Sequence, residues 1–130
     1  SETTTQLSIL LVDDAEDNSI VIQAFFKNTC YRLELAFDGS EGLEKAKSGQ
    51  FDVILMDVQM PIMDGYTATR KIREWEAETG RPKMPIIAMT ANAMKEDIDQ
   101  AHNAGCDRYL TKPVRKKLLL ETIEEIWCER

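Results

Sequence analysis

Residues 51–57 read FDVILMD, so an apolar run ends abruptly on Asp57. A short, nearly continuous apolar run is typical of a strand that is buried on both faces, as in a parallel sheet. Residues 7–14 have the same pattern, because the apolar run 7–12 stops at Asp13 and Asp14. Both segments predict a buried strand that carries acids at its carboxyl end.

Strand and helix periodicities alternate along the rest of the chain. Further strands are predicted at 32–36, 85–89 and 108–110, and the first of these alternates polar and apolar side chains as an edge strand does. Asp17 or Asn18 is expected to cap the first helix. Residues predicted to line the inner faces of the five helices are Ile20, Val21, Ala24 and Phe25; Leu43 and Ala46; Ile72 and Trp75; Met94, Ile98 and Ala101; Leu118, Leu119, Ile123, Ile126 and Trp127.

Five strand-helix units predict an α/β fold with a parallel sheet and helices on both faces, because right-handed crossovers place helices on the two sides. In such a doubly wound sheet, ligands bind outside the carboxyl ends of the strands. We expect one domain at 7–127, a flexible segment at 1–6 and a short end at 128–130. This size is ordinary for a single domain.

Composition excludes several classes of protein. A formal net charge of -7 argues against a broad nucleic-acid contact surface, which needs clustered Lys and Arg. No apolar run approaches the roughly 20 residues of a membrane helix, and residues 1–6 lack the basic start of a signal peptide. We therefore expect a cytoplasmic domain without direct nucleic-acid or membrane contact.

Two groups of side chains receive ordinary structural interpretations. The cysteines have no C-x-x-C spacing, which favours buried thiols over disulfides or a zinc site, and they are Cys30, Cys106 and Cys128. The basic clusters are interpreted as solvated helix faces, and they are Arg70, Lys71 and Arg73 and then Arg115, Lys116 and Lys117.

Acids that end neighbouring strands predict a metal site. Asp13, Asp14 and Asp57 would repel one another at one edge of the sheet unless a cation shared the site. Oxygen ligands favour Mg²⁺ or a similar hard ion. His102 is the only histidine, which excludes an imidazole-rich transition-metal site.

The ordered set of these residues resembles the receiver domain of response regulators. The resemblance rests on Asp13-Asp14, the run MDVQMPIMDG at 56–65, Thr90-Ala91 and Lys112-Pro113, and it covers about 7–127. It implies a flavodoxin-like five-stranded parallel sheet in the order 2-1-3-4-5. It also implies a signalling domain of two-component systems, which catalyses only its own phosphorylation and dephosphorylation.

The resemblance further implies a role for each site residue. Asp57 accepts a phosphoryl group from a histidine kinase or histidine phosphotransfer protein, Lys112 is a second cation beside it, and the Lys112-Pro113 peptide is cis. The ligands of Mg²⁺ or Mn²⁺ are Asp14, Asp57 and the main-chain carbonyl of Gln59, with Asp13 acting through water. Thr90 and Tyr109 change position on phosphorylation and present a surface to a possible downstream effector.

Alternatives remain open for several of these assignments. Taken alone, Thr90 is more often a turn hydroxyl or helix cap, and Tyr109 is equally well a packed edge aromatic. A phosphatase of the haloacid-dehalogenase type also uses an aspartate nucleophile, but it would want an acid where Gln59 stands. A receiver-like scaffold without phosphorylation is a further alternative. The run at 56–65 and the residues TANA at 90–93 resemble the receivers of hybrid histidine kinases more than stand-alone regulators.

Overall fold

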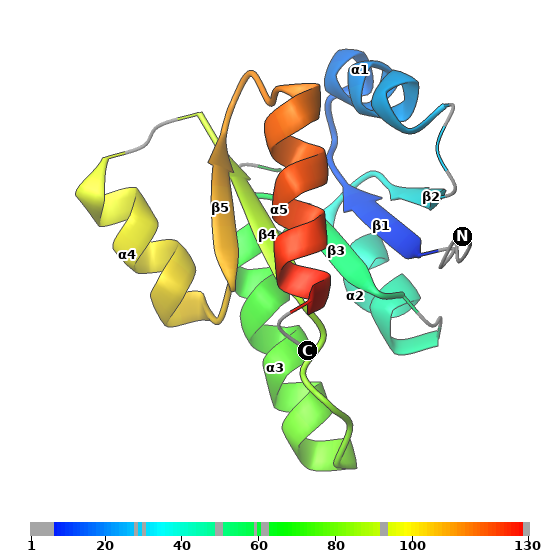
Figure 1. The fold of residues 1–130 in the computed structure, drawn as a ribbon. Helices are drawn as coiled ribbons and strands as arrows, with labels where there is room; N and C mark the ends of the chain where they lie inside the picture. The colour runs from blue at the N-terminus through cyan, green and yellow to red at the C-terminus, as the bar shows by residue number, and fades with distance from the viewer. Residues whose placement is uncertain are drawn as a thin grey trace.

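The structure is a computed structural model that describes residues 7–27, 29, 31–48, 51–58, 60, 63–91 and 94–128. Within these residues, strands and helices alternate (Figure 1). They are β1 (Ser8–Val12), α1 (Glu16–Phe26), β2 (Arg32–Ala36), α2 (Gly39–Ser48), β3 (Val53–Asp57), α3 (Gly65–Thr79), β4 (Ile86–Thr90), α4 (Lys95–Ala104), β5 (Arg108–Thr111) and α5 (Lys116–Cys128). All neighbouring strands are parallel and the order is β2-β1-β3-β4-β5, which confirms the predicted fold.

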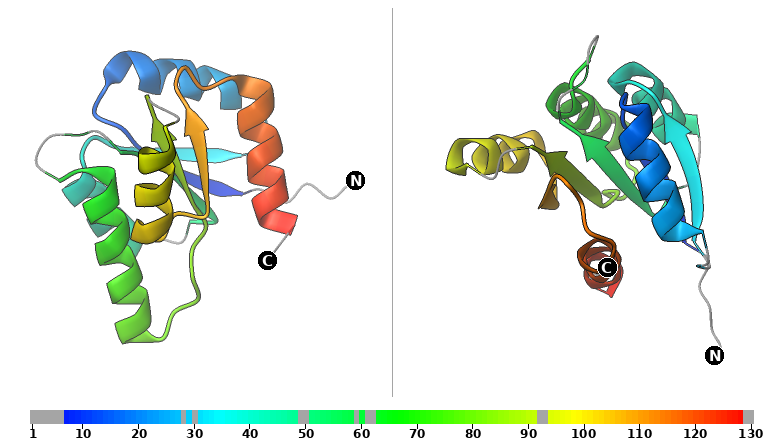
Figure 2. Two further views of the ribbon diagram at one scale, coloured as in Figure 1. Left: turned by 90° about the vertical axis from the view of Figure 1, so that its left-hand side faces the viewer. Right: turned by 90° about the horizontal axis from the view of Figure 1, so that it is seen from above.

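Helices lie on both faces of the sheet (Figure 2). Alternate side chains of the central strands enter two separate cores. Ile9 and Leu11 of β1 face α1 and α5, whereas Leu10 and Val12 face the layer that contains α2, α3 and α4. Burial on both faces explains why β1, β3 and β4 are apolar nearly throughout. In the described part of the chain, each helix is too short or too polar to cross a bilayer.

The predicted inner face of α1 is wrong. Ile20 and Val21 are 55% and 47% exposed, and the buried residues are Ser19, Ile22 and Phe26. Three consecutive apolar residues at 20–22 fit more than one helical face, so the spacing alone does not select one. Ser19 is accommodated inside because its hydroxyl donates to the Ala15 carbonyl at 3.1 Å.

The predicted side-chain cap of α1 is also wrong. Ala15 is the N-cap residue and makes no side-chain cap hydrogen bond. Asn18 instead donates its side-chain amide to the Asp13 carboxylate. Asn18 therefore hydrogen-bonds the acid that follows β1 and does not cap α1.

Three other residues predicted inward lie at or near the surface. Met94 and Leu118 are exposed. Trp75 is only partly buried, and Arg81 lies over its ring at 4.8 Å from the centroid. In contrast, Leu43, Ala46 and most of the apolar residues of α5 are buried as predicted.

Arg73 is the exception to the solvated basic patches, because its side chain is only 14% exposed. Its guanidinium donates to Glu76, to Asp107 and to the main-chain carbonyls of Met84 and Gly105, at 2.8–3.0 Å. The two acids also accept main-chain N–H groups, Glu76 from Met84 and Asp107 from Ile86. This network, the Arg73 network, ties α3 to the start of β4 and to the α4–β5 turn.

Of the three cysteines, Cys106 is buried as predicted, while Cys30 and the Cys128 side chain lie outside the described residues. Burial raises the pKa of the Cys106 thiol above its ordinary value, an effect that a hydrogen bond to Thr69 and the charge of Arg73 partly offset. The thiol is therefore held in its unreactive, protonated form.

Candidate functional site

The adjacent strands β1 and β3 bring three carboxylates to one edge of the sheet. Asp13 and Asp14 directly follow β1, and Asp57 is the last residue of β3. One oxygen of each carboxylate lies within 4.8 Å of the others. Asp13 and Asp57 are buried and Asp14 is exposed, so the cluster opens toward solvent on the Asp14 side.

Local hydrogen bonds hold Asp13 in place. Its main-chain N–H donates to the Ala36 carbonyl at 3.0 Å, which extends the pairing with β2 by one residue. One carboxylate oxygen accepts the N–H of Ala15 at 2.8 Å and the other accepts the Asn18 amide. Asn18 was not recognised as a site residue from the sequence. The sequence feature that could have identified it is an amide side chain about one helical turn after Asp13 and Asp14.

Lys112 supplies the positive charge of the site. Its Nζ lies 3.0 Å from Oδ1 of Asp57 and 3.9 Å from Oδ2 of Asp13. The Lys112-Pro113 peptide is cis, as the resemblance implies. The main-chain N–H of Lys112 donates to the Thr90 carbonyl at 2.7 Å, which anchors the end of β5 to the end of β4.

Asp57 is only 2% exposed, although Lys112 above it is 25% exposed. The Asp57 carboxylate is thus buried while the ammonium paired with it still reaches solvent. Three carboxylates and one ammonium leave a formal surplus of two negative charges at the cluster. This oxygen-rich, electronegative donor set fits a hard divalent cation.

The chain packs tightly beside Asp57. A Cβ added to Gly65 would lie 2.2 Å from the Asp57 carbonyl oxygen, so a side chain there would force the backbone to move. Gly65 also donates its N–H to the Val58 carbonyl at 3.3 Å. The side chain of Asp64 caps α3 by accepting the N–H of Thr67 at 2.8 Å. Close approach is therefore the physical reason for glycine at 65.

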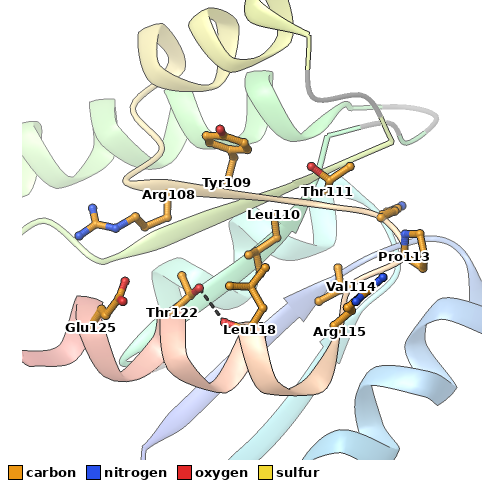
Figure 3. A pocket seen from close by; sticks show the side chains of 11 residues that line it. Arg108, Tyr109, Leu110, Thr111, Pro113, Val114, Arg115, Leu118, Thr122 and Glu125 are labelled. Atoms are coloured by element: carbon orange, nitrogen blue, oxygen red, sulfur yellow. Dashed lines mark hydrogen bonds between the residues drawn. The ribbon is translucent and has the colours of Figure 1, made fainter.

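Thr90 and Tyr109 occupy different environments. Thr90 ends β4 and is buried, and it lies one residue beyond the position paired with Asp57. Tyr109 is exposed on β5 and points away from α5 (Figure 3). The remaining predicted ligand, Gln59, lies outside the described residues.

A groove of about 520 Å³ lies between β5 and α5. In Figure 3, Leu110 of the strand faces Leu118 of the helix, and Thr122 donates to the Leu118 carbonyl at 2.7 Å. Lys112 and Arg115 also line the groove. It is separate from the acid cluster and shares only Lys112 with it.

Comparisons with known proteins agree with this geometry. The family model of the response regulator receiver domain matches residues 9–124. The hybrid signal transduction histidine kinase G of Dictyostelium discoideum is 42% identical over 116 residues, which is 88% of this chain and 3% of that protein. The sensor protein GacS of Pseudomonas syringae pv. syringae is 36% identical over 88% of this chain and 13% of that protein. The chain thus spans a small part of these relatives.

Solved structures are similar over nearly the whole chain. The receiver domain of the sensor histidine kinase PA1611 from Pseudomonas aeruginosa PAO1, which has a magnesium ion coordinated in its active-site cleft, is 37% identical with a TM-score of 0.85 and covers 97% of this chain and 100% of that one. The receiver domain of Ssk1 from Saccharomyces cerevisiae, crystallised with the histidine phosphotransfer protein Ypd1, is 30% identical with a TM-score of 0.92 and covers 98% and 92%.

Proposed function

Because this chain belongs to the response-regulator receiver family, the signalling domains of two-component systems, we propose that it accepts a phosphoryl group on Asp57 from a phosphohistidine donor in a Mg²⁺-dependent reaction. The observation that supports this most directly is the clustering of three carboxylates within 4.8 Å, with Lys112 at 3.0 Å from Asp57. A simple strand-terminating acid would need neither the other acids nor the ammonium.

The transfer exchanges one phosphorus bond for another. An oxygen of Asp57 attacks the phosphorus of the donor, the new O–P bond forms, and the P–N bond to the histidine breaks. Its electron pair returns to the imidazole, which takes up a proton. Little covalent chemistry is required of the protein, so orientation and neutralisation of the phosphoryl oxygens dominate catalysis.

Lys112 has to loosen its ion pair with Asp57 for this reaction to occur, because its Nζ lies 3.0 Å from Oδ1, one of the two oxygens that could attack. The lysine has a flexible four-carbon stem and is partly exposed, so it can swing away from the carboxylate without unfolding the sheet. It then faces the incoming phosphoryl group as a cation. The ion pair with Asp57 is in this way exchanged for one with the phosphoryl oxygens.

A divalent cation would supply charge neutralisation opposite Lys112. Its protein ligands would be Asp14, Asp57 and the main-chain carbonyl of Gln59, and Asp13 would act through water. The acid cluster and the magnesium ion bound to the PA1611 receiver domain support Mg²⁺, with Mn²⁺ as a substitute. Asn18 would keep Asp13 turned toward this ion.

The proposed partners follow from the same chemistry. The donor is a histidine kinase or a histidine phosphotransfer protein, and the complex of the similar Ssk1 receiver domain with Ypd1 supports the second class. Similarity to hybrid kinases supports a cytoplasmic receiver, at 7–127, that works within such a kinase. A downstream effector would read the phosphorylated surface, and neither nucleic acid nor a membrane is a direct partner of this domain.

Thr90 and Tyr109 are the proposed signalling residues. Once Asp57 carries phosphate, the Thr90 hydroxyl moves toward it and Tyr109 rotates into the space that is vacated. Thr90 ends the strand beside β3, which suits a hydroxyl that reports on Asp57. Such a switch is a shift in population between two conformations, biased by the phosphoryl group.

Phosphotransfer from a radiolabelled phosphohistidine donor domain tests the proposed function. With Mg²⁺ we expect label on this chain in an alkali-labile acyl phosphate, and with excess EDTA we expect none, because the charge of the acid cluster is then not neutralised. Alkali-stable label, or equal transfer in EDTA, would contradict the proposal. Restoring activity with Mn²⁺ checks that EDTA acts by removing the metal.

The variants Lys112→Ala and Thr90→Ala should separate chemistry from signalling. The first removes a charge that stabilises the transferring phosphoryl group, so we expect phosphotransfer to slow by about 10²–10³-fold. The second removes one neutral hydrogen bond, so it should change that rate by less than about tenfold while abolishing the response of β5 amide exchange to phosphorylation. Equal rates and equal exchange responses in the two variants would defeat this division of roles.

A further inference from the structure

We propose that Tyr66 is a positioning residue that couples the loop after Asp57 to α4 through a hydrogen bond between helices. The inference rests on the proposed function, since it concerns how phosphorylation of Asp57 reaches α4. Phosphorylation of Asp57 would then act on α4 in two ways, through Thr90, which precedes α4 in the chain, and through α3.

The first turn of α3 is fixed against the acceptor residue. Gly65, the first residue of the helix, lies so close to the Asp57 carbonyl that no side chain fits between them, and its N–H donates to the Val58 carbonyl. Tyr66 follows directly. A displacement of the Asp57 peptide therefore moves the backbone of Tyr66 with it, because a close-packed contact cannot compress.

The side chain of Tyr66 spans the gap to α4. Its ring packs, partly buried, against the core shared by α2, α3 and α4, and its hydroxyl donates to the Asp97 carbonyl at 3.2 Å. Burial raises the pKa of Tyr66 above its ordinary value, and the nearby charge of Asp97 adds to this effect. The hydroxyl therefore keeps its proton and remains a donor at physiological pH.

The two ends of α4 are held very differently. The C-terminal end is fixed by buried Ala101 and Ala104 and by the Gly105 carbonyl, which accepts two N–H groups of Arg73. At the N-terminal end, Met94 is 61% exposed and, as the N-cap residue, makes no side-chain cap hydrogen bond. Figure 1 shows this helix at the β5 side of the molecule.

The Tyr66 hydrogen bond thus reaches the weakly held end of α4, which is also the end that follows Thr90 along the chain. Its strength need only be modest, because residues 94–98 at this end are exposed or only half-buried. Phosphorylation would then bias α4 from two points, the chain after Thr90 and the first turn of α3. Removal of the hydroxyl should cut one connection and leave the ring packed.

Tyr66→Phe tests this with amide hydrogen exchange measured with and without beryllofluoride in Mg²⁺. Loss of one hydrogen bond should speed exchange in the first two turns of α4 by about fivefold. We also expect the change that beryllofluoride causes in these amides to fall to less than half of the wild-type change. Reciprocity of coupling further requires that Tyr66→Phe bind beryllofluoride with an affinity different from that of wild type.

Tyr31→Phe is the matched control, since it removes a tyrosine hydroxyl on the other face of the sheet, where the ring packs on Phe26. It should leave the α4 response unchanged. An α4 response in Tyr66→Phe equal to that of wild type would overturn the inference even if global stability falls. Failure of the wild-type chain to bind beryllofluoride would instead reject the proposed function.

Discussion

Asp57→Asn is expected to abolish beryllofluoride binding in the presence of Mg²⁺. Beryllofluoride mimics the acyl phosphate by binding to an anionic carboxylate oxygen. An amide side chain supplies no such oxygen. The substitution also removes one of the three carboxylates that would hold the metal. Isothermal titration, or the fluorescence of Trp75 and Trp127, measures the binding.

Asp17→Asn serves as its control, because it makes the same change of charge at an exposed position on α1. This variant should bind beryllofluoride as tightly as wild type. Equal binding by Asp57→Asn would show that the acceptor lies elsewhere and would reject the assignment. A thermal melt of each variant establishes that both are folded, so loss of binding is not loss of structure.

Arg73→Ala is expected to cost about 3–5 kcal/mol of the free energy of unfolding, the usual loss when one partner of a buried ion pair is removed. The substitution leaves Glu76 and Asp107 without their guanidinium, together with the carbonyls of Met84 and Gly105. Lys83, at 4.0 Å from Asp107 and well exposed, replaces little of this. Urea unfolding followed by circular dichroism measures the loss.

Arg70→Ala, three residues earlier on the exposed side of α3, is the matched control and should shift stability by no more than about 0.5 kcal/mol. Arg73→Lys should recover only part of the loss, because an ammonium cannot reproduce the planar fork that serves four partners. Equal unfolding midpoints for Arg73→Ala and Arg70→Ala would refute the importance of the Arg73 network.

The layered fold could be predicted from the sequence because the burial of a strand determines its pattern of apolar residues. In β1 and β3, both faces are covered, so almost every side chain is apolar and each strand ends where acids begin. In the edge strand β2, polar and apolar residues alternate because the exposed and the less exposed side chains alternate. The buried faces of the helices were harder to predict. At 20–22, three consecutive apolar residues do not show which side of α1 is buried.

The candidate site divides in the same way. The types of side chain and their positions after strands pointed to Asp13, Asp14, Asp57 and Lys112, and topology alone required them to share an edge. Contacts made by side chains were not encoded in any local pattern. The Asn18 bond to Asp13, the ion pair of Lys112 with Asp57 and the close approach of Gly65 to Asp57 each depend on distances that only the folded chain sets.

By itself, the sequence determined the parallel sheet, its two helical layers and the strand ends that carry acids, because periodicity and burial are local properties of a chain. Only the tertiary structure decided that the Arg73 side chain is just 14% exposed and fully hydrogen-bonded while Arg70 is solvated, and that Ser19 rather than Ile20 faces the core. The physical reason is that hydrogen bonds and close packing depend on neighbours remote along the chain. Residues of the same type, a few positions apart, therefore meet entirely different partners.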